Sequence, residues 1–255
     1  MSHQNPYTKN INRIEFVVTN ACTGRCKHCS QGEHSSGGAH IEGEAAEGVV
    51  YQLCSEFQIE SLMTFGGEPL LYLDEVCKIH AAAREMNIPE RSLITNGFFC
   101  RDKEKIKEAA ARLVQSGVNG ILLSVDAFHQ ETIPLCYVKE FAMAVKDTGT
   151  PFRINPAWLV SRENDNPYNN RTAEILKEFE AIGVPAHEGN VIFPSGNALK
   201  YLGEYFDPEE KYIDPYEEDS YDIRTVSVSA DGAVLGGNIY QTDILEIIKR
   251  YRPEE

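Results

Sequence analysis

Short apolar runs rich in β-branched residues alternate along the chain with longer segments whose apolar residues recur at helical spacing. The first pattern predicts strands and the second predicts amphipathic helices. The predicted strands are 13–18, 59–65, 92–95, 120–125, 152–160 and 191–193, and the predicted helices between them are 44–57, 73–86, 103–116, 138–146 and 172–182. Strands that alternate with helices of this length pair in parallel through right-handed crossovers. The pattern therefore indicates an α/β protein, either a partial (β/α)6 barrel of the TIM type or an open doubly wound sheet.

The last part of the chain follows a different pattern. Residues 201–222 are rich in Glu, Asp, Tyr and Pro, which predicts an exposed acidic connection. Beyond it, Asp231-Gly232 separates two apolar runs, 225–229 and 233–235, and so predicts a β-hairpin, followed by a helix over 243–251. We therefore expect a barrel over residues 1–200, a connecting loop over 201–222 and a C-terminal cap over 223–255.

Composition and charge exclude several classes of protein. The 255 residues are 42% hydrophobic and 25% charged, as in an ordinary globular protein, and no apolar run approaches the ~18 residues of a membrane span. The net charge of −15 repels phosphate backbones and anionic lipids, which argues against nucleic-acid or membrane binding. Because no cationic segment followed by an apolar stretch opens the chain, the expected location is the cytoplasm.

Three of the seven cysteines form a close group just after the first predicted strand. Cys22, Cys26 and Cys29 have the spacing C-x3-C-x2-C. In parallel α/β folds the carboxyl ends of the strands carry the ligand site, so this group lies on the expected functional face. A structural zinc site needs four protein ligands; the fourth could come from one of the nearby histidines His28, His34 and His40. Three cysteines on a cubane of four irons would instead leave one iron open.

Further motifs follow the later strands. The second strand leads into Gly66-Gly67-Glu68-Pro69, the third into Thr95-Asn96-Gly97, the fourth into Ser124-Val125-Asp126 and the sixth into Pro194-x-Gly196-x-Ala198. Together with the cysteine group, this series resembles the radical S-adenosylmethionine (SAM) enzymes over roughly residues 13–200. The resemblance favours the partial barrel, and it implies that the three cysteines bind one 4Fe-4S cluster whose open iron is chelated by SAM.

The resemblance also implies how SAM is held. Glu68, within the Gly66-Gly67-Glu68-Pro69 turn, would accept a hydrogen bond from the amino group of SAM, while the glycines allow close approach of the backbone. His28 would lie by the adenine. The residues implied to contact the ribose or methionyl part are Asn96, Ser124 and Asp126.

Residues that act on the substrate do not follow from the sequence. Cys100, near the third strand end, and Cys136, in the loop after the fourth, are candidate hydrogen donors to a product radical, with a structural role as the alternative for each. His129 is a candidate substrate contact, but we expect a histidine in a solvent-exposed loop.

The C-terminal cap resembles the twitch or SPASM extensions of this family, which bind auxiliary clusters through additional cysteines. No cysteine follows Cys136, and Gly236 and Gly237 stand where one would be expected. We therefore expect a cap without an auxiliary cluster that covers the open side of the barrel.

The resemblance implies a radical SAM enzyme in which an electron from a donor such as flavodoxin or ferredoxin cleaves SAM and yields a 5′-deoxyadenosyl radical. That radical would abstract hydrogen from a substrate, with a peptide favoured. Two alternatives stay open: a dehydrogenase or mutase acting on a small molecule, and a non-catalytic iron–sulfur or metal-binding protein.

Overall fold

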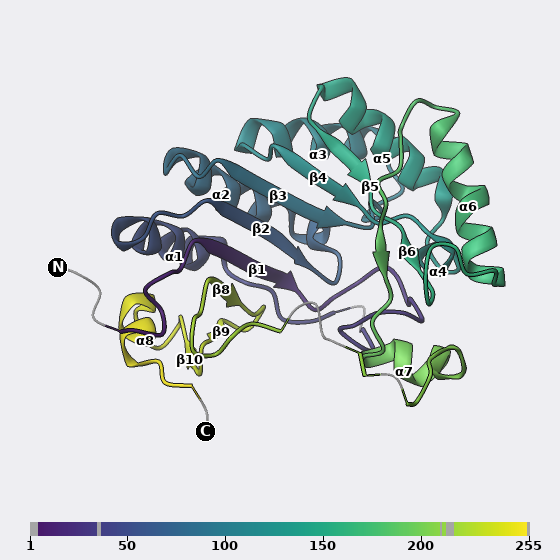
Figure 1. Cartoon of the computed structure of the whole chain (residues 1–255). Coiled ribbons are helices and arrows are strands. Elements are labelled where there is room, and N and C mark those ends of the chain that lie inside the picture. Colours follow the sequence, from purple (N-terminus) through teal and green to yellow (C-terminus); the bar gives the residue numbers. More distant parts are fainter. Residues whose placement is uncertain (1–4, 35–36, 210, 213–216, 254–255) are drawn as a thin grey trace.

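The computed structural model describes residues 5–34, 37–209, 211–212 and 217–253. Its centre is a six-stranded sheet in the order β5-β4-β3-β2-β1-β8, in which all neighbours are parallel (Figure 1). The strands are β1 (Arg13–Thr19), β2 (Ser61–Gly66), β3 (Glu90–Thr95), β4 (Gly120–Leu123), β5 (Phe152–Ile154) and β8 (Thr225–Val228). This parallel sheet confirms the expected α/β fold and is consistent with a partial barrel of the TIM type.

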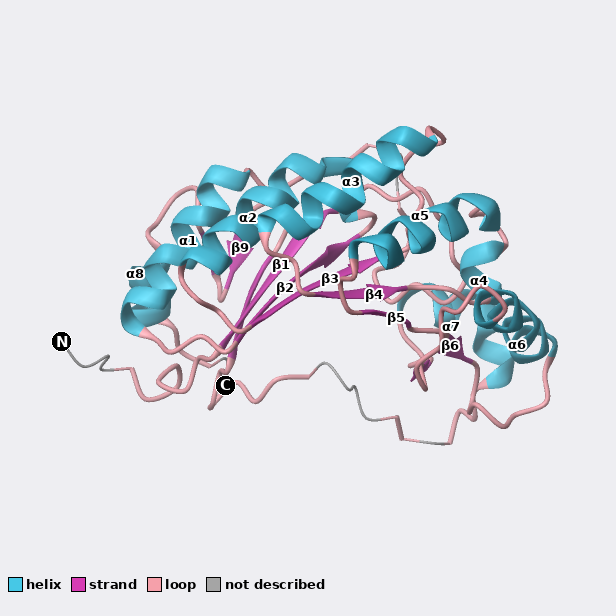
Figure 2. Ribbon diagram, turned by 90° about the horizontal axis from the view of Figure 1, so that it is seen from above, coloured by secondary structure: helices cyan, strands magenta, loops and turns pink. Residues whose placement is uncertain are grey.

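Four long helices lie along one face of the sheet (Figure 2): α1 (Gly43–Glu56), α2 (Leu73–Glu85), α3 (Lys103–Ser116) and α5 (Leu135–Thr148). Helix α3 shows how the sequence sets their bounds. Asp102 accepts hydrogen bonds from two backbone N–H groups of the first turn, and Gly117 ends the helix at φ 106°. Ile106, Ala110 and Leu113 recur at helical spacing and are buried against the sheet.

The main core lies between the sheet and these helices. Large side chains with at most 1% of their surface exposed come from both layers, with Phe16 on β1, Leu62 on β2, Leu53 on α1 and Phe141 on α5. Burial of each such side chain contributes roughly 1.5–3 kcal/mol. Among the described residues, no helix has both the length and the apolar character needed to cross a membrane.

A smaller apolar cluster lies beyond β5, where several short elements meet. These elements are α4 (Ala127–Gln130), β6 (Ala157–Trp158), α6 (Pro167–Glu180), β7 (Asn190–Val191) and α7 (Gly196–Leu202). The cluster consists of Phe128, Leu159, Ile192, Ala198 and Leu202. It holds α7 and α4 at the end of the sheet at which the cysteine loop lies (Figure 1).

The fifth and sixth predicted strands differ from expectation in length and pairing. The predicted strand 152–160 is divided into β5 and β6. The N–H of Asn155 still donates to the carbonyl of Leu123 in β4, but Pro156, which follows, has no N–H to continue the pairing. The sixth strand is the short β7, which pairs in parallel with β6 in a separate two-stranded sheet. A single bridge between Ile154 and Ala186 connects this pair to the main sheet.

The C-terminal hairpin was predicted with the wrong strand partners. The tight turn at Asp231-Gly232 is present, and the N–H of Ser229 donates to the carbonyl of Ala233 across it. However, β8 pairs in parallel with β1 at the edge of the main sheet, and the antiparallel hairpin lies between β9 (Ala233–Val234) and β10 (Gly237–Asn238). Helix α8 (Ile244–Arg250) follows, and the side chain of Asn5 donates to the carbonyl of Ile248 at its end.

Two short 3-10 helices complete the description: η1 (Pro69–Tyr72) after β2 and η2 (Gly203–Tyr205) after α7. Of the expected acidic connection, residues 210 and 213–216 lie outside the described residues. The described residues of 203–222 on either side of them are mostly exposed, as the composition predicts.

Candidate functional site

The cysteine loop begins directly after β1 and is held by its own backbone. Cys26 is buried, with 7% of its surface exposed, whereas Cys22 and Cys29 are partly exposed. Cys29 donates its N–H to the carbonyl of Cys26, and the N–H of Gly24 donates to Sγ of Cys22 at 3.3 Å. The three cysteines are thus presented on a turn at the carboxyl end of β1, as the sequence predicts.

The two glycines after β2 meet the start of the cysteine loop. The N–H of Gly67 donates to Thr19, and the N–H of Glu68 donates to the carbonyl of Ala21 at 2.8 Å. A Cβ at Gly67 would lie 2.1 Å from that carbonyl oxygen, and one at Gly66, where φ is 137°, would lie 2.6 Å from the carbonyl oxygen of Thr19. The close approach that these glycines permit is therefore to the backbone of the cysteine loop, not only to a ligand.

The start of α7 fixes the other end of the loop. The N–H of Asn197 donates to the carbonyl of Cys29, and its side-chain amide donates to the carbonyls of Cys26 and Gly32. Gly196, at φ 51°, passes so close that a Cβ would lie 2.7 Å from the carbonyl oxygen of Cys29. Asn197 could not be singled out from the sequence, because it occupies a variable position of the Pro194-x-Gly196-x-Ala198 pattern.

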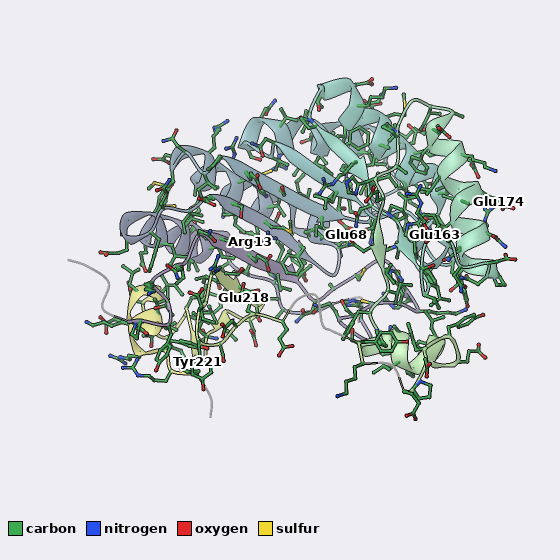
Figure 3. The ribbon with its side chains drawn as sticks, viewed as in Figure 1. Arg13, Glu68, Glu163, Glu174, Glu218 and Tyr221 are labelled. Carbon is green, nitrogen blue, oxygen red and sulfur yellow. The ribbon has the colours of Figure 1, made fainter. Side chains whose placement is uncertain are left out.

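Glu68 lies just past the carboxyl end of β2 and has no solvent exposure (Figure 3). Its Oε1 accepts from Oγ1 of Thr95 at 2.7 Å and from the N–H of Leu70, and its Oε2 accepts from the N–H of Asn96 at 2.8 Å. Burial raises the pKa of Glu68 to about 7, against the opposing effect of these three donors. Since a carboxylate can accept about four hydrogen bonds, Oε2 keeps one acceptor position.

Asn96 follows β3 and lies beside the first cysteine. Its Nδ2 is 3.7 Å from Sγ of Cys22 and 3.2 Å from Oγ1 of Thr23, and its Oδ1 accepts from the N–H of Phe98. Ser124 is partly buried after β4, where its N–H donates to the carbonyl of Thr95. The predicted polar residues after β2, β3 and β4 therefore lie at the same edge of the sheet as the cysteines.

Asp126 is fully buried and organises α4. Its Oδ1 accepts from the N–H of His129, and its Oδ2 lies 2.8 Å from Nδ1 of His129 and 3.1 Å from the N–H of Ala157. Burial alone would raise the pKa of Asp126, but the His129 imidazole and backbone more than offset it and lower that pKa. The expectation of a solvent-exposed loop for His129 is wrong, because Asp126 holds it on a helix with 16% of its side chain exposed.

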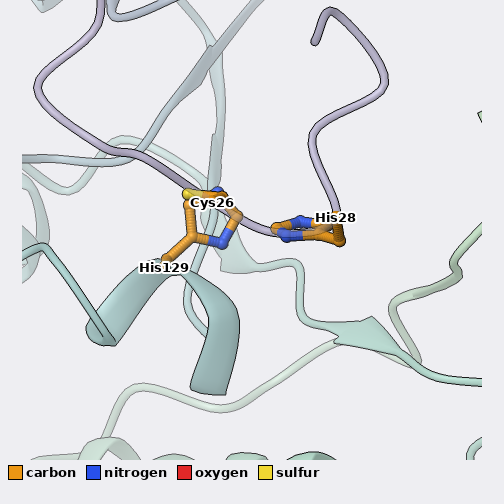
Figure 4. Close-up of side chains that lie close together, drawn as sticks. All are labelled: Cys26, His28 and His129. Carbon is orange, nitrogen blue, oxygen red and sulfur yellow. The ribbon is translucent and has the colours of Figure 1, made fainter. Parts of the chain in front are cut away.

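His28 lies against this helix. Its ring centroid is 4.9 Å from that of Phe128 and 4.8 Å from that of His129. Burial lowers the pKa of His28 to about 4, so the ring is neutral at physiological pH. Atoms of Cys26, His28 and His129 that can bind a metal all lie within 4.8 Å of one another (Figure 4).

The other candidates lie in different surroundings. Cys136 is exposed and lies in the first turn of α5, not in the loop before that helix as predicted, because the helix begins earlier than its apolar pattern indicates. Cys100 is partly buried in the loop before α3, with its thiol 3.6 Å from the carbonyl of Asp102. Nε2 of His34 lies 3.1 Å from Sγ of Cys29, whereas His40 stacks on Tyr72.

The donor set fits an iron–sulfur cluster better than a single zinc ion bound by the three motif cysteines. Within the part of the chain that the structure describes, the close set of three potential ligands is Cys26, His28 and His129, and the three motif cysteines do not form such a set. In a cubane each thiolate binds a different iron, so the sulfurs need not converge on one point.

The two more buried thiols of the motif would change their protonation on binding a metal. Burial raises the pKa of Cys22 to about 11, and it raises that of Cys26 further, with the nearby Asp126 carboxylate adding to the effect. Without a cation both thiols stay protonated at neutral pH, and a bound metal would deprotonate them.

Comparison of the sequence with known families and proteins gives consistent matches. Residues 16–148 match the family described as the Radical SAM superfamily. A probable GTP 3′,8-cyclase of Methanocaldococcus jannaschii is 26% identical over 125 residues, which are 49% of this chain and 40% of that protein. The GTP 3′,8-cyclase of Desulforamulus reducens is 29% identical over 128 residues, 49% of this chain and 38% of that protein. The chain thus covers well under two thirds of these relatives.

Two solved structures share the fold over most of the chain. Native anSMEcpe with bound AdoMet, which is SAM, has a TM-score of 0.59 at 16% identity, and the alignment covers 95% of this chain and 81% of the anSMEcpe chain. SuiB of Streptococcus suis bound to its precursor peptide SuiA has a TM-score of 0.59 at 11% identity, covering 94% and 65%. At these identities the likeness is one of fold.

Proposed function

This chain belongs to the radical SAM superfamily, whose members bind a 4Fe-4S cluster and SAM, and we propose that it is an enzyme of that chemistry. When bound, the cluster supplies an electron that cleaves SAM reductively, and the resulting 5′-deoxyadenosyl radical abstracts hydrogen from a substrate. The observation that carries the proposal is the cysteine loop at the carboxyl edge of the sheet. Hydrogen bonds from the backbone just after β2 and from the backbone and side chain of Asn197 in α7 hold this loop. The electron donor in this proposal is a protein such as flavodoxin or ferredoxin.

Cys22, Cys26 and Cys29 hold the cluster as thiolates in this proposal. The amide of Asn96, 3.7 Å from Sγ of Cys22, donates toward that sulfur and tunes it. The three cysteines would hold three of the four irons, which would leave the fourth open to SAM.

The neighbouring polar residues bind SAM. Glu68 uses the remaining acceptor position on Oε2 for the amino group, and its three protein donors keep the carboxylate in one orientation. Asn96 and Ser124 contact the methionyl or ribose part, and His28 lies by the adenine. Both oxygens of Asp126 are already bonded to α4 and to Ala157, so we assign Asp126 to positioning this wall of the site rather than to SAM itself.

The test is anaerobic reconstitution followed by assay of iron, sulfide and 5′-deoxyadenosine. The wild-type chain is expected to bind four irons and to release 5′-deoxyadenosine from SAM when reduced. Replacing Cys22, Cys26 or Cys29 with Ala removes both properties. Cys54→Ala, which changes a partly buried cysteine of α1, is the matched control and keeps both. Four irons bound by the Cys26→Ala variant, or intact cluster without any SAM cleavage, contradicts the proposal.

We further propose a peptide as the substrate class. The fold shared with SuiB, whose structure contains a precursor peptide, supports this choice. The net charge of −15 disfavours a polyanion such as GTP, the substrate in the names of the aligned relatives. GTP added to the reconstituted enzyme should therefore leave the rate of 5′-deoxyadenosine formation unchanged. Conversion of GTP to a cyclised product would replace the peptide with a small-molecule substrate and leave the radical SAM assignment intact.

A further inference from the structure

Three metal-binding side chains meet at one wall of the site in a grouping that differs from the cysteine motif. Sγ of Cys26 and ring nitrogens of His28 and His129 all lie within 4.8 Å of one another (Figure 4). Two of these residues come from the cysteine loop and the third comes from α4, so the grouping depends on the packing of α4 against that loop. A cysteine with two neutral histidines is a donor set that zinc and cobalt bind readily.

His129 already has the support that a metal-binding histidine requires. Its Nδ1 lies 2.8 Å from Oδ2 of Asp126, which as a carboxylate can only accept, so Nδ1 carries a proton and Nε2 is the nitrogen left to bind a metal in the neutral ring. Asp126 is fixed in turn by the backbone N–H groups of His129 and Ala157. A carboxylate behind a ligating histidine is a recurrent arrangement in metal sites, where it sets the tautomer and the ring orientation.

His28, a member of the same grouping, has an unused ring nitrogen. Its Nδ1 is buried and has no hydrogen-bond partner, which is an uncommon state for a buried polar atom. The contacts of the ring with Phe128 and His129 restrict its movement. A cation bound by this nitrogen would give it a partner, and the buried carboxylate of Asp126 is close enough to interact electrostatically with the ring.

We propose that, when no cluster is present, Cys26, His28 and His129 bind one divalent transition-metal ion such as Zn²⁺ or Co²⁺. The Cys26 thiol releases its proton to solvent on binding, and water fills the fourth position of a tetrahedral site. Ligand atoms around such an ion are ~3.5 Å apart, so the three donors need to close by about 1 Å. Since Cys26 serves both the ion and the cluster, the two exclude each other; this exclusion rests on the proposed function.

Cobalt provides the probe, because tetrahedral Co²⁺ with a thiolate ligand has strong visible and charge-transfer absorption. The full chain, freed of iron under anaerobic conditions, is titrated with CoCl₂ and then with ZnCl₂. We expect one cobalt per chain with a thiolate charge-transfer band, displaced by one equivalent of zinc. His129→Gln and Cys26→Ser are expected to weaken cobalt binding more than 10-fold, and Asp126→Asn about 10- to 100-fold.

The matched controls are Cys22→Ser and Cys29→Ser, which remove motif cysteines outside the grouping. Both are expected to lose the iron–sulfur cluster and to keep the cobalt site at wild-type affinity. Circular dichroism of each metal-free variant confirms that it is folded, and His28→Gln is a second ligand variant should His129→Gln not fold. Cobalt binding that requires Cys22 and Cys29 but not His28 or His129, or no cobalt binding at all, overturns the proposal.

The exclusion is tested on protein that carries its cluster. Cluster-loaded chain is expected to bind no cobalt at this site, and one equivalent of zinc added before iron and sulfide is expected to block reconstitution. Cobalt bound in full beside an intact cluster overturns the sharing of Cys26. If the chain assembles no cluster under any condition, the proposed function fails while the cobalt result still decides the present proposal.

Discussion

Glu68→Gln provides a direct measure of the energetics of the site. Glu68 is fully buried and accepts hydrogen bonds from Thr95, Leu70 and Asn96. Burial raises its pKa from the ordinary 4.5 to about 7. The folded chain therefore binds a proton on Glu68 more tightly than the unfolded chain does. Its contribution to stability is fully present below pH 4.5 and is lost as the pH rises through 7.

The size of the effect follows from the difference in pKa. One pKa unit corresponds to about 1.4 kcal/mol, and integrating the linkage between pH 5 and pH 8 gives a loss of about 2.5 kcal/mol in the free energy of unfolding. Gln cannot ionise, so Glu68→Gln removes this loss. The variant has a separate cost of roughly 1–3 kcal/mol because its NH2 group faces a backbone donor, but this cost does not depend on pH.

The measurement is urea unfolding of the cluster-free wild-type and Glu68→Gln chains between pH 5 and pH 8. The difference between their free energies of unfolding is expected to shift by about 2.5 kcal/mol in favour of the variant as the pH rises. Glu104→Gln, a side chain with 82% exposure, is the control for a change of surface charge. A difference that is constant with pH, or that shifts toward the wild type, would refute the reasoning.

Further outcomes are expected in the same region and in the core. Glu68→Gln should weaken SAM binding roughly 10- to 150-fold in calorimetry, because it removes a charged hydrogen-bond acceptor that contributes about 1.5–3 kcal/mol. The iron content should stay unchanged, since Glu68 is not a cluster ligand. An unchanged affinity for SAM would show that Glu68 is not in the SAM site. Gly67→Ala places a Cβ 2.1 Å from the carbonyl oxygen of Ala21. It should lower the free energy of unfolding in urea by about 1–3 kcal/mol and should also lower the iron content. Gly48→Ala is the control and should change neither, because its Cβ would meet no atom within 4 Å. Burial lowers the pKa of His80 to about 3, so the unfolded chain binds a proton there more tightly than the folded chain does. As the pH falls from 6.5, the free energy of unfolding of the wild type should therefore decrease by up to about 1.4 kcal/mol per pH unit relative to that of His80→Gln. Parallel curves of unfolding free energy against pH for the two proteins would contradict this.

The position of the site could be predicted from the sequence because parallel strands bring their carboxyl ends to one edge. Cys22, Glu68, Asn96 and Ser124 follow successive strands, so the pattern of strands and helices already placed them together. The partners of each residue could not be predicted. The side chain of Asn197 supports the cysteine loop by donating hydrogen bonds to backbone carbonyls. Since every residue has a backbone carbonyl, the sequence does not show which of them accept such a bond.

The strand partners of the tail could not be predicted for a similar reason. The alternation of Val226 and Val228 indicates a strand with one buried face, but a hairpin strand and an added edge strand have the same alternation. Leu235 reads as part of an apolar run, yet it adopts φ 46° and forms the turn with Gly236 at φ 75°. This two-residue turn joins β9 and β10, and a leucine at such a position is not a turn signal.

The pairing of β8 with β1 determines the order in which the sheet can be completed during synthesis. The strand that leads into the cysteine loop has β2 on one side, a neighbour close in sequence, and β8 on the other, where Arg13 is paired with Thr225 near the opposite end of the chain. Contacts across so long a loop form late, because the entropy of closure must be overcome first. A nascent chain can therefore assemble β1 to β5 while the outer edge of β1 still exposes its backbone groups. Until the tail has been synthesised, the strand that leads into the cysteine loop therefore stands at an open edge of the sheet.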